Sequence, residues 1–245
     1  MTAKLQAQLT QLILARVTEA MISEGYALSE PLDGYPSTEP DTPDPWWTRL
    51  WFNAADSGVP RTAAAVEVHV ERHRDGGVMV SGSASLVSAE IDEIVRGLIG
   101  LAPTRSKTID TISFGAFDDP PAPLADFEVT HRDFIDEFLA YFMGHVCGGV
   151  AEWFARRGSL DVLLVTARQP ATVEWDDNPD PVVVRATVVL CVLEGRVADA
   201  VDLMAWYLGR SEFHRDDSLE AASAFDAAVA QRFPAYAQAR ASIGG

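Results

Sequence analysis

Hydrophobic side chains in residues 2–24 recur every three or four positions, which is the spacing of an amphipathic helix. Gly25 follows this stripe and is typical of a helix C-terminus. The pattern predicts an N-terminal helix with one buried face. Residues 29–45 contain five prolines among acidic residues, and proline at that density excludes a regular helix or a central strand. We therefore expect a loop there.

Apolar and polar residues alternate in residues 64–74, so that Val66, Val68 and Val70 share one face. This two-residue period predicts a strand with one buried side. Residues 75–77 (Asp-Gly-Gly) predict a hairpin turn, and residues 78–86 continue as the return strand. The aromatic-rich residues 46–53 predict a third strand. Gly82 lies inside the return strand and indicates space for a close neighbour.

A helix is predicted after Ser88, which can cap it, and Gly100 is expected to end that helix. Residues 109–117 alternate again and can add a strand to the same sheet. Thr130 and Asp133 resemble a capping box that opens a long helix reaching Gly158. Its expected core positions are Phe134, Phe138, Phe142, Val146, Val150 and Trp153. The pair Gly148-Gly149 is expected to weaken or kink this helix.

The remaining elements are a predicted short hairpin and a set of helices. Residues 160–167 are strongly apolar and predict a strand, with 172–176 as its partner. Residues 182–193 contain β-branched residues that favour a strand, but their apolar positions also fit a helical stripe. The turn-like residues 194–196 lead us to favour a helix–turn–helix that continues to residue 208. A last helix is predicted over 218–233, with Asp217 and Glu220 as its capping pair.

Together these elements predict an α+β fold. We expect an antiparallel sheet flanked by helices in residues 1–117, a Pro/Asp-rich connector at 118–129, and a mostly helical half with a short hairpin at 130–245. A chain of 245 residues is long enough for two cores, and a single core is the alternative.

The chain is strongly acidic, with 19 Lys and Arg against 36 Asp and Glu, a formal net charge of −17. Such a surface repels nucleic-acid phosphates and anionic lipids, so binding to either is disfavoured. It suits a basic protein partner, whose approach it would steer, and the alternative is that the charge only maintains solubility. The sequence contains neither a signal-peptide core nor an apolar run of membrane-span length, so we expect a cytoplasmic protein.

Glu67, His69, Glu71 and His73 occupy alternate positions of the predicted strand 64–74 and therefore share one face. Carboxylates and imidazoles so placed are candidate metal ligands. The order differs from the zinc-protease motif His-Glu-x-x-His, because Glu71 lies between the two histidines. A solvated outer face of a half-buried sheet also holds such residues, and we favour that interpretation. We expect no cofactor.

Aromatic residues crowd the predicted strand 46–53, where Trp46 and Phe52 point away from Trp47 and Trp51. Either a helix covers the face that carries Trp46 and Phe52, or both form an exposed patch of the kind that binds partners. A second candidate binding region surrounds the connector, where carboxylates are available to arginines of a partner. Its residues are Asp118, Asp119, Asp126 and Glu128.

Parts of a general acid–base group occur on the predicted long helix, because Glu137, Tyr141 and His145 lie four residues apart on one face. Gly-x-Ser-x-Gly and the glycine-rich phosphate-binding loops are absent from the sequence. An enzyme is therefore the less favoured class.

The short, acidic, motif-poor chain is similar in composition to bacterial immunity and adaptor proteins. The resemblance implies a binding module that engages a basic protein, for example a toxin that it neutralises. Two alternatives stay open: an enzyme or small-ligand binder with a pocket between the two halves, and a structural component of a homo-oligomer.

Overall fold

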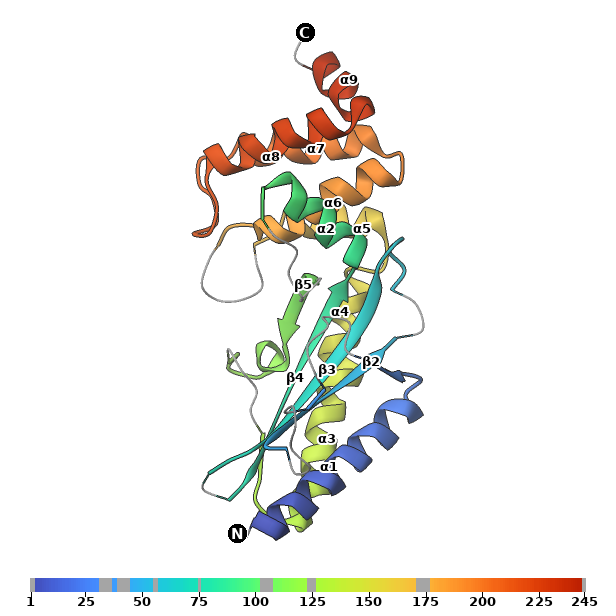
Figure 1. Ribbon diagram of the computed structural model, residues 1–245, viewed down its shortest axis with the longest axis vertical. Coiled ribbons are helices and arrows are strands. Elements are labelled where there is room, and N and C mark those ends of the chain that lie inside the picture. Colours follow the sequence, from blue (N-terminus) through green and yellow to red (C-terminus); the bar gives the residue numbers. More distant parts are fainter. Residues whose placement is uncertain are drawn as a thin grey trace. The chain divides into compact units, whose positions relative to one another are not determined.

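A computed structural model describes residues 3–30, 37–38, 45–54, 57–74, 76–101, 108–122, 127–170 and 177–243 (Figure 1). It confirms the α+β fold, with an antiparallel sheet followed by a mainly helical part. The chain forms two compact units. Unit 1 comprises Met1–Asp56, Ala63–Leu86 and Thr111–Ala155, and unit 2 comprises Ser57–Thr62, Val87–Asp110 and Arg156–Gly245. The division around a connector at 118–129 stays a prediction.

The sheet lies mainly in unit 1. Its strands are β1 (Ala27–Ser29), β2 (Trp47–Asn53), β3 (Ala63–Arg72), β4 (Val78–Val87), β5 (Thr108–Ser113) and β6 (Phe127–Val129). They follow one another in the order β1-β2-β3-β4-β5, and β6 also pairs with β4. In the β2–β3 register, Phe52 lies opposite Val66 and Leu50 opposite Val68. The predicted strands at 46–53, 64–74 and 78–86 are therefore confirmed, whereas the predicted strand 109–117 ends at Ser113 and gives way to a 3₁₀ helix.

One face of the sheet carries the core of unit 1, because Val66, Val68 and Val70 on β3 are all fully buried. Helices α1 (Ala3–Ser23) and α3 (Ile135–His145) lie next to each other along the sheet (Figure 1). Helix α1 turns its predicted apolar stripe inward and buries Leu9, Ile13, Val17 and Met21.

A buried amide connects α1 to the β3–β4 turn. The side-chain nitrogen of Gln6 donates hydrogen bonds to the carbonyl oxygens of His73 and Gly77, both at 2.7 Å. Only 6% of Gln6 is exposed, so these bonds satisfy a polar group that water does not reach freely.

Helix α3 begins later than predicted. A 3₁₀ turn (Arg132–Phe134) precedes it, and the Nδ1 atom of His131 caps this turn by accepting from the backbone N–H of Asp133 at 3.4 Å. The predicted Thr130–Asp133 capping box is therefore wrong. Phe134 is 48% exposed and not a core residue, because the tighter 3₁₀ turn takes it off the stripe of Phe138 and Phe142.

The predicted weak point of the long helix is confirmed. Helix α3 passes into a π-helical segment (Val146–Val150) that contains Gly148 and Gly149, and then into α4 (Ala151–Ala155). The remaining expected core positions, Phe142 and Val146 among them, are buried.

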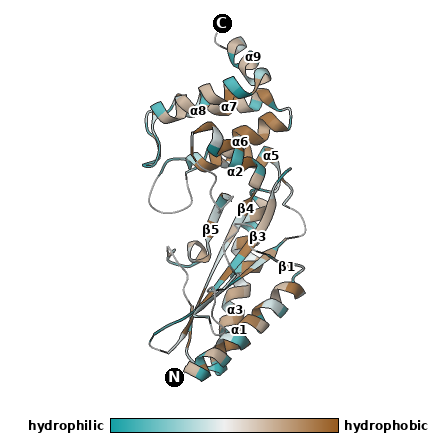
Figure 2. Cartoon of the chain, in the orientation of Figure 1, coloured by the Kyte–Doolittle hydropathy of each residue, from teal (hydrophilic) through white to brown (hydrophobic). Residues whose placement is uncertain are grey.

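Unit 2 is helical. Its helices are α2 (Ala89–Leu98), α5 (Leu160–Thr166), α6 (Pro181–Leu193), α7 (Val197–Leu208), α8 (Leu219–Arg232) and α9 (Pro234–Ile243). The predicted helix–turn–helix is confirmed by α6 and α7, which Gly195 joins at a positive φ of 73°. Helix α6 is apolar along most of its length (Figure 2) and buries most of its side chains. The cap of α8 is Ser218, so the predicted Asp217–Glu220 capping pair is wrong.

Residues 160–167, predicted as a strand, form helix α5. Ser159 caps it by accepting from the backbone N–H of Val162 at 3.3 Å. Its buried leucines Leu160, Leu163 and Leu164 follow helical spacing, whereas Val165 is 59% exposed. A short apolar run fits a strand and a buried helix equally well. In this segment the helix cap at Ser159 is the feature that favours the helix. The expected partner strand 172–176 lies outside the described residues.

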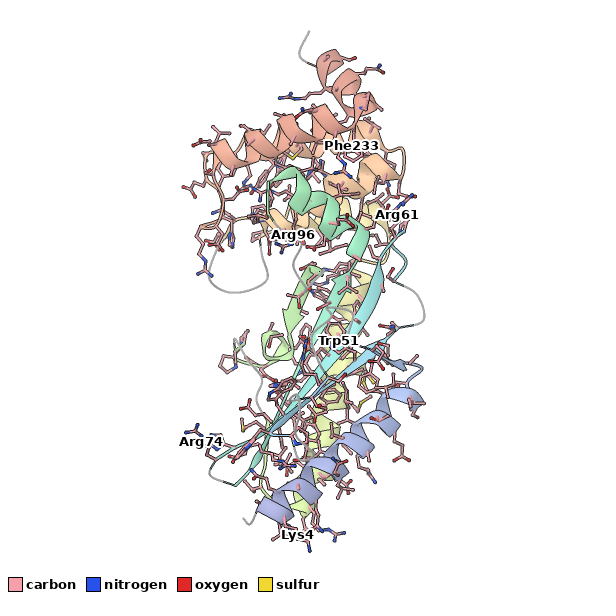
Figure 3. All side chains as sticks on the ribbon, in the orientation of Figure 1. Lys4, Trp51, Arg61, Arg74, Arg96 and Phe233 are labelled. Atoms are coloured by element: carbon pink, nitrogen blue, oxygen red, sulfur yellow. The ribbon has the colours of Figure 1, made fainter. Side chains whose placement is uncertain are left out.

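In unit 2, Arg61 joins the segment Ser57–Thr62 to two helices. Its guanidinium donates to the carboxylates of Glu90 at 2.9 Å and Glu194 at 2.7 Å. Figure 3 labels Arg61 beside these helices. Across the parts of the chain described, none of the helices combines the length and hydropathy needed to span a bilayer.

Candidate functional site

The structure brings Asp118 together with two side chains of α3, and we refer to Asp118, Tyr141 and His145 as the Asp118 cluster. The hydroxyl of Tyr141 donates to both carboxylate oxygens of Asp118, at 2.9 and 3.1 Å. The Nε2 atom of His145 lies 3.0 Å from Oδ1 of the same carboxylate. This nitrogen is buried but is off the line of a hydrogen bond. The contact is therefore mainly electrostatic.

Local backbone geometry positions the carboxylate. Asp118 follows a short 3₁₀ helix (Phe114–Phe117), and the carbonyl oxygen of Gly115 accepts from the N–H groups of Asp118 at 3.2 Å and Ala122 at 2.7 Å. The ring of Phe117 packs directly on Gly149 of the π-helical segment, where a Cβ atom would collide with it. Tyr141 and His145 lie one helical turn apart, so both reach the same carboxylate.

Aromatic rings surround the cluster. The ring of His145 lies 4.5 Å from that of Tyr141, 5.9 Å from Phe114 and 6.1 Å from Phe117, measured between centroids. Phe127 of β6 lies 5.3 Å from Tyr141. The side chains of His145 and Asp118 are 12% and 25% exposed. The carboxylate is therefore mostly enclosed but still reachable from solvent.

Burial, the hydrogen bond to Asp118 and the negative charge of Asp118 together raise the pKa of Tyr141 to about 12. The phenol consequently stays protonated at neutral pH and acts as a neutral donor to the carboxylate.

The partner of Asp118 distinguishes it from other enclosed carboxylates of the chain. Five carboxylates with side-chain exposures between 0% and 22% each lie against an arginine. These pairs are Glu67 with Arg49, Asp92 with Arg96, Asp110 with Arg157, Asp217 with Arg185 and Asp226 with Arg240. Among the described residues, the ion-pair partner of Asp118 is His145, and no lysine or arginine pairs with it.

The four metal candidates are not assembled into a metal site. Glu67 pairs with Arg49, and the ring of His69 lies 6.2 Å from that of Trp47. Glu71 and His73 are exposed. Within the ranges that the structure describes, no group of three or more His, Cys, Asp or Glu side chains is placed to hold a metal ion.

The aromatic candidates separate into one exposed and one buried residue. Trp46 is 50% exposed, whereas Phe52 is fully buried on the same face as the β3 valines. Phe52 therefore lies on a covered face, which is the first of the two alternatives, and adds nothing to a surface patch. Trp51, labelled in Figure 3, is also buried, and the guanidinium of Arg49 lies 5.6 Å from its ring.

The four acidic candidates lie in different environments. Asp118 belongs to the cluster, Asp119 and Glu128 are exposed, and Asp126 lies outside the described residues. The sequence indicated Tyr141 and His145 as possible acid–base groups but gave no sign that Asp118 meets them. Glu137, expected on the same face, is exposed and takes no part in the cluster.

No family model, curated protein or solved structure matches this chain.

Proposed function

We propose that this protein is a binding module that engages a basic protein partner. The observation that carries the proposal is the density of carboxylates in residues 118–137, which hold seven acidic side chains and one arginine. Within this acidic segment the side chains of Asp133 and Asp136 are 77% and 87% exposed. Asp119 and Glu128 are exposed as well. Asp119, Glu128 and Asp133 are available to lysines and arginines of another protein, whereas Asp136 forms an exposed ion pair with Arg16 at 3.0 Å that a partner would have to displace.

An exposed aromatic ring lies within the same segment. Phe134 is 48% exposed between Asp133 and Asp136. Aromatic residues framed by charged side chains are a frequent composition of binding hot spots, since the ring supplies apolar contact while the charges set orientation. The net charge of −17 supports the same proposal, because it accelerates the approach of a positively charged partner.

The test begins with affinity capture from the native host, followed by association and dissociation kinetics of the captured partner across a salt series. Surface charge is screened within about 10 Å at 0.1 M salt, so association should slow steeply as salt rises while dissociation changes little. Neutralising Asp119, Glu128, Asp133 and Asp136 together, to Asn or Gln, should reproduce much of this slowing at low salt.

A matched control removes four exposed carboxylates elsewhere, through the combined changes E19Q, E93Q, E212Q and E220Q. Both quadruple variants change the net charge equally, so a larger loss of association rate in the first set assigns the effect to the acidic segment. Equal losses, or an association rate indifferent to salt, would reject the proposal and leave the charge as a solubility device.

Phe134→Ala separates the apolar contribution from the charge. The ring is half exposed, so its removal should leave the stability of the fold within about 0.5 kcal/mol of the parent. We expect dissociation to speed up about tenfold or more, while association and its salt dependence stay as in the parent. Val165→Ala, at an exposed apolar position of α5, is the control and should leave both rates unchanged.

A further inference from the structure

Asp118 lacks the arginine partner that five other enclosed carboxylates among the described residues have. Enclosing a charged group is costly unless a partner of opposite charge compensates it, and five comparable carboxylates have an arginine for that purpose. Asp118 has a neutral phenol and an imidazole instead. No lysine or arginine among the described residues compensates the charge of Asp118.

The carboxylate retains the capacity to accept another donor. Two carboxylate oxygens offer about four acceptor positions, and the hydroxyl of Tyr141 uses its single proton on them. Nε2 of His145 is misaligned for a hydrogen bond and leaves the remaining positions weakly engaged. A quarter of the Asp118 side chain is still exposed, so a donor from solvent has access.

The surrounding rings favour a cation over a neutral donor. Phe117, Tyr141 and Phe127 are each half-buried, and Phe127 lies 5.3 Å from Tyr141. The faces of such rings attract ammonium and guanidinium groups, and the attraction grows where water is partly excluded. A carboxylate set among aromatic rings therefore combines both elements of cation recognition.

We infer that the Asp118 cluster is a subsite for one cationic side chain, a lysine ammonium or an arginine guanidinium, presented by the basic partner. This inference rests on the proposed function and identifies a specific contact within it. The incoming cation fills the role that Arg157 fills for Asp110 and Arg185 fills for Asp217.

The experiment is an NMR titration of the full chain with Nα-acetyl-arginine amide and Nα-acetyl-lysine amide, following the ring signals of Tyr141 and His145. We expect saturable shifts from one or both cations, and none from the neutral isostere Nα-acetyl-citrulline amide. Asp118→Asn should weaken binding at least about tenfold, since it removes a charge-assisted contact. Asp119→Asn, one residue away and exposed, should change it by less than about twofold.

The urea midpoint of Asp118→Asn is compared with that of the parent, so that a loss of binding in a folded variant is assigned to the lost charge. Equal shifts from citrulline, or equal losses in the Asp118 and Asp119 variants, would overturn the subsite. If a captured partner shows the expected salt dependence while the cations fail to bind, the subsite is wrong and the binding function stands. If the cations bind but the association rate of the partner does not depend on salt, the subsite stands and the proposed binding function is wrong.

Discussion

Gly82 lies on β4 directly beneath an aromatic ring. A Cβ atom at this position would lie 2.7 Å from the ring of Phe114, which is itself buried and 5.2 Å from Phe142. The sequence predicted this close approach, because a glycine inside an alternating strand gives up packing and usually does so for a neighbour. A single small residue thus positions the 3₁₀ helix that leads to Asp118.

We expect Gly82→Ala to lower the free energy of unfolding by about 1–3 kcal/mol, because the ring of Phe114 has to shift within a packed core. Urea denaturation measures the effect. Gly144→Ala is the control, since nothing lies within 4 Å of a Cβ there and alanine suits a helix better than glycine. A loss of stability in the control as large as in Gly82→Ala would contradict the packing argument.

Other single residues were beyond sequence reasoning. The burial of Phe52 and the exposure of Phe134 depend on which face of an element meets the core and on where a helix begins. The contact between Asp118 and His145 depends on the path of the chain over the 26 positions between them. No local pattern specifies a contact of that kind.

At the scale of elements, the amide of Gln6 connects α1 to the β3–β4 hairpin through two carbonyl oxygens. Gln6→Ala should lower the free energy of unfolding by about 1–3 kcal/mol, since it leaves the carbonyls of His73 and Gly77 without this donor. Chemical denaturation gives the value, and faster amide hydrogen exchange in the hairpin would localise it.

Gln8→Ala is the matched control for Gln6→Ala. Gln8 lies on the same helix but is exposed, so its replacement should change the stability by less than about 0.5 kcal/mol. If both substitutions cost the same, α1 is held by its apolar stripe alone.

Most elements could be predicted because the spacing of their apolar residues and the turn or cap residues at their ends indicated the same structure. The valines of β3, the turn before β4 and Ser88 before α2 each specify local structure that packing then preserves. Residues 160–167 could not be assigned in this way, because an apolar run of eight residues suits either regular structure. The cap at Ser159 was the available signal.

At the scale of the whole molecule, buried tyrosines make the stability of the fold depend on pH in the alkaline range. Burial raises the pKa of Tyr141 to about 12 and raises the pKa values of Tyr26, Tyr207 and Tyr236 as well. An unfolded chain releases phenol protons near pH 10, whereas the folded chain retains them. The folded state therefore binds more protons above that pH, and stability must fall as pH rises.

Burial also raises the pKa of the thiols of Cys147 and Cys191, which an unfolded chain deprotonates near pH 8.5. Urea midpoints should accordingly hold steady up to about pH 8 and then decline through pH 9, 10 and 11. Tyr141→Phe should reduce the slope of the decline. A midpoint that stays constant to pH 11.5 would mean that these phenols ionise as readily in the folded protein as in the unfolded chain.

The two compact units alternate along the polypeptide, and each is assembled from three separated segments. Neither can be cut out as one continuous length of chain, so no single truncation yields either unit intact. A stop codon after residue 110 would leave unit 1 without α3 and unit 2 without most of its helices. A single crossover between two genes could therefore not exchange either unit for another.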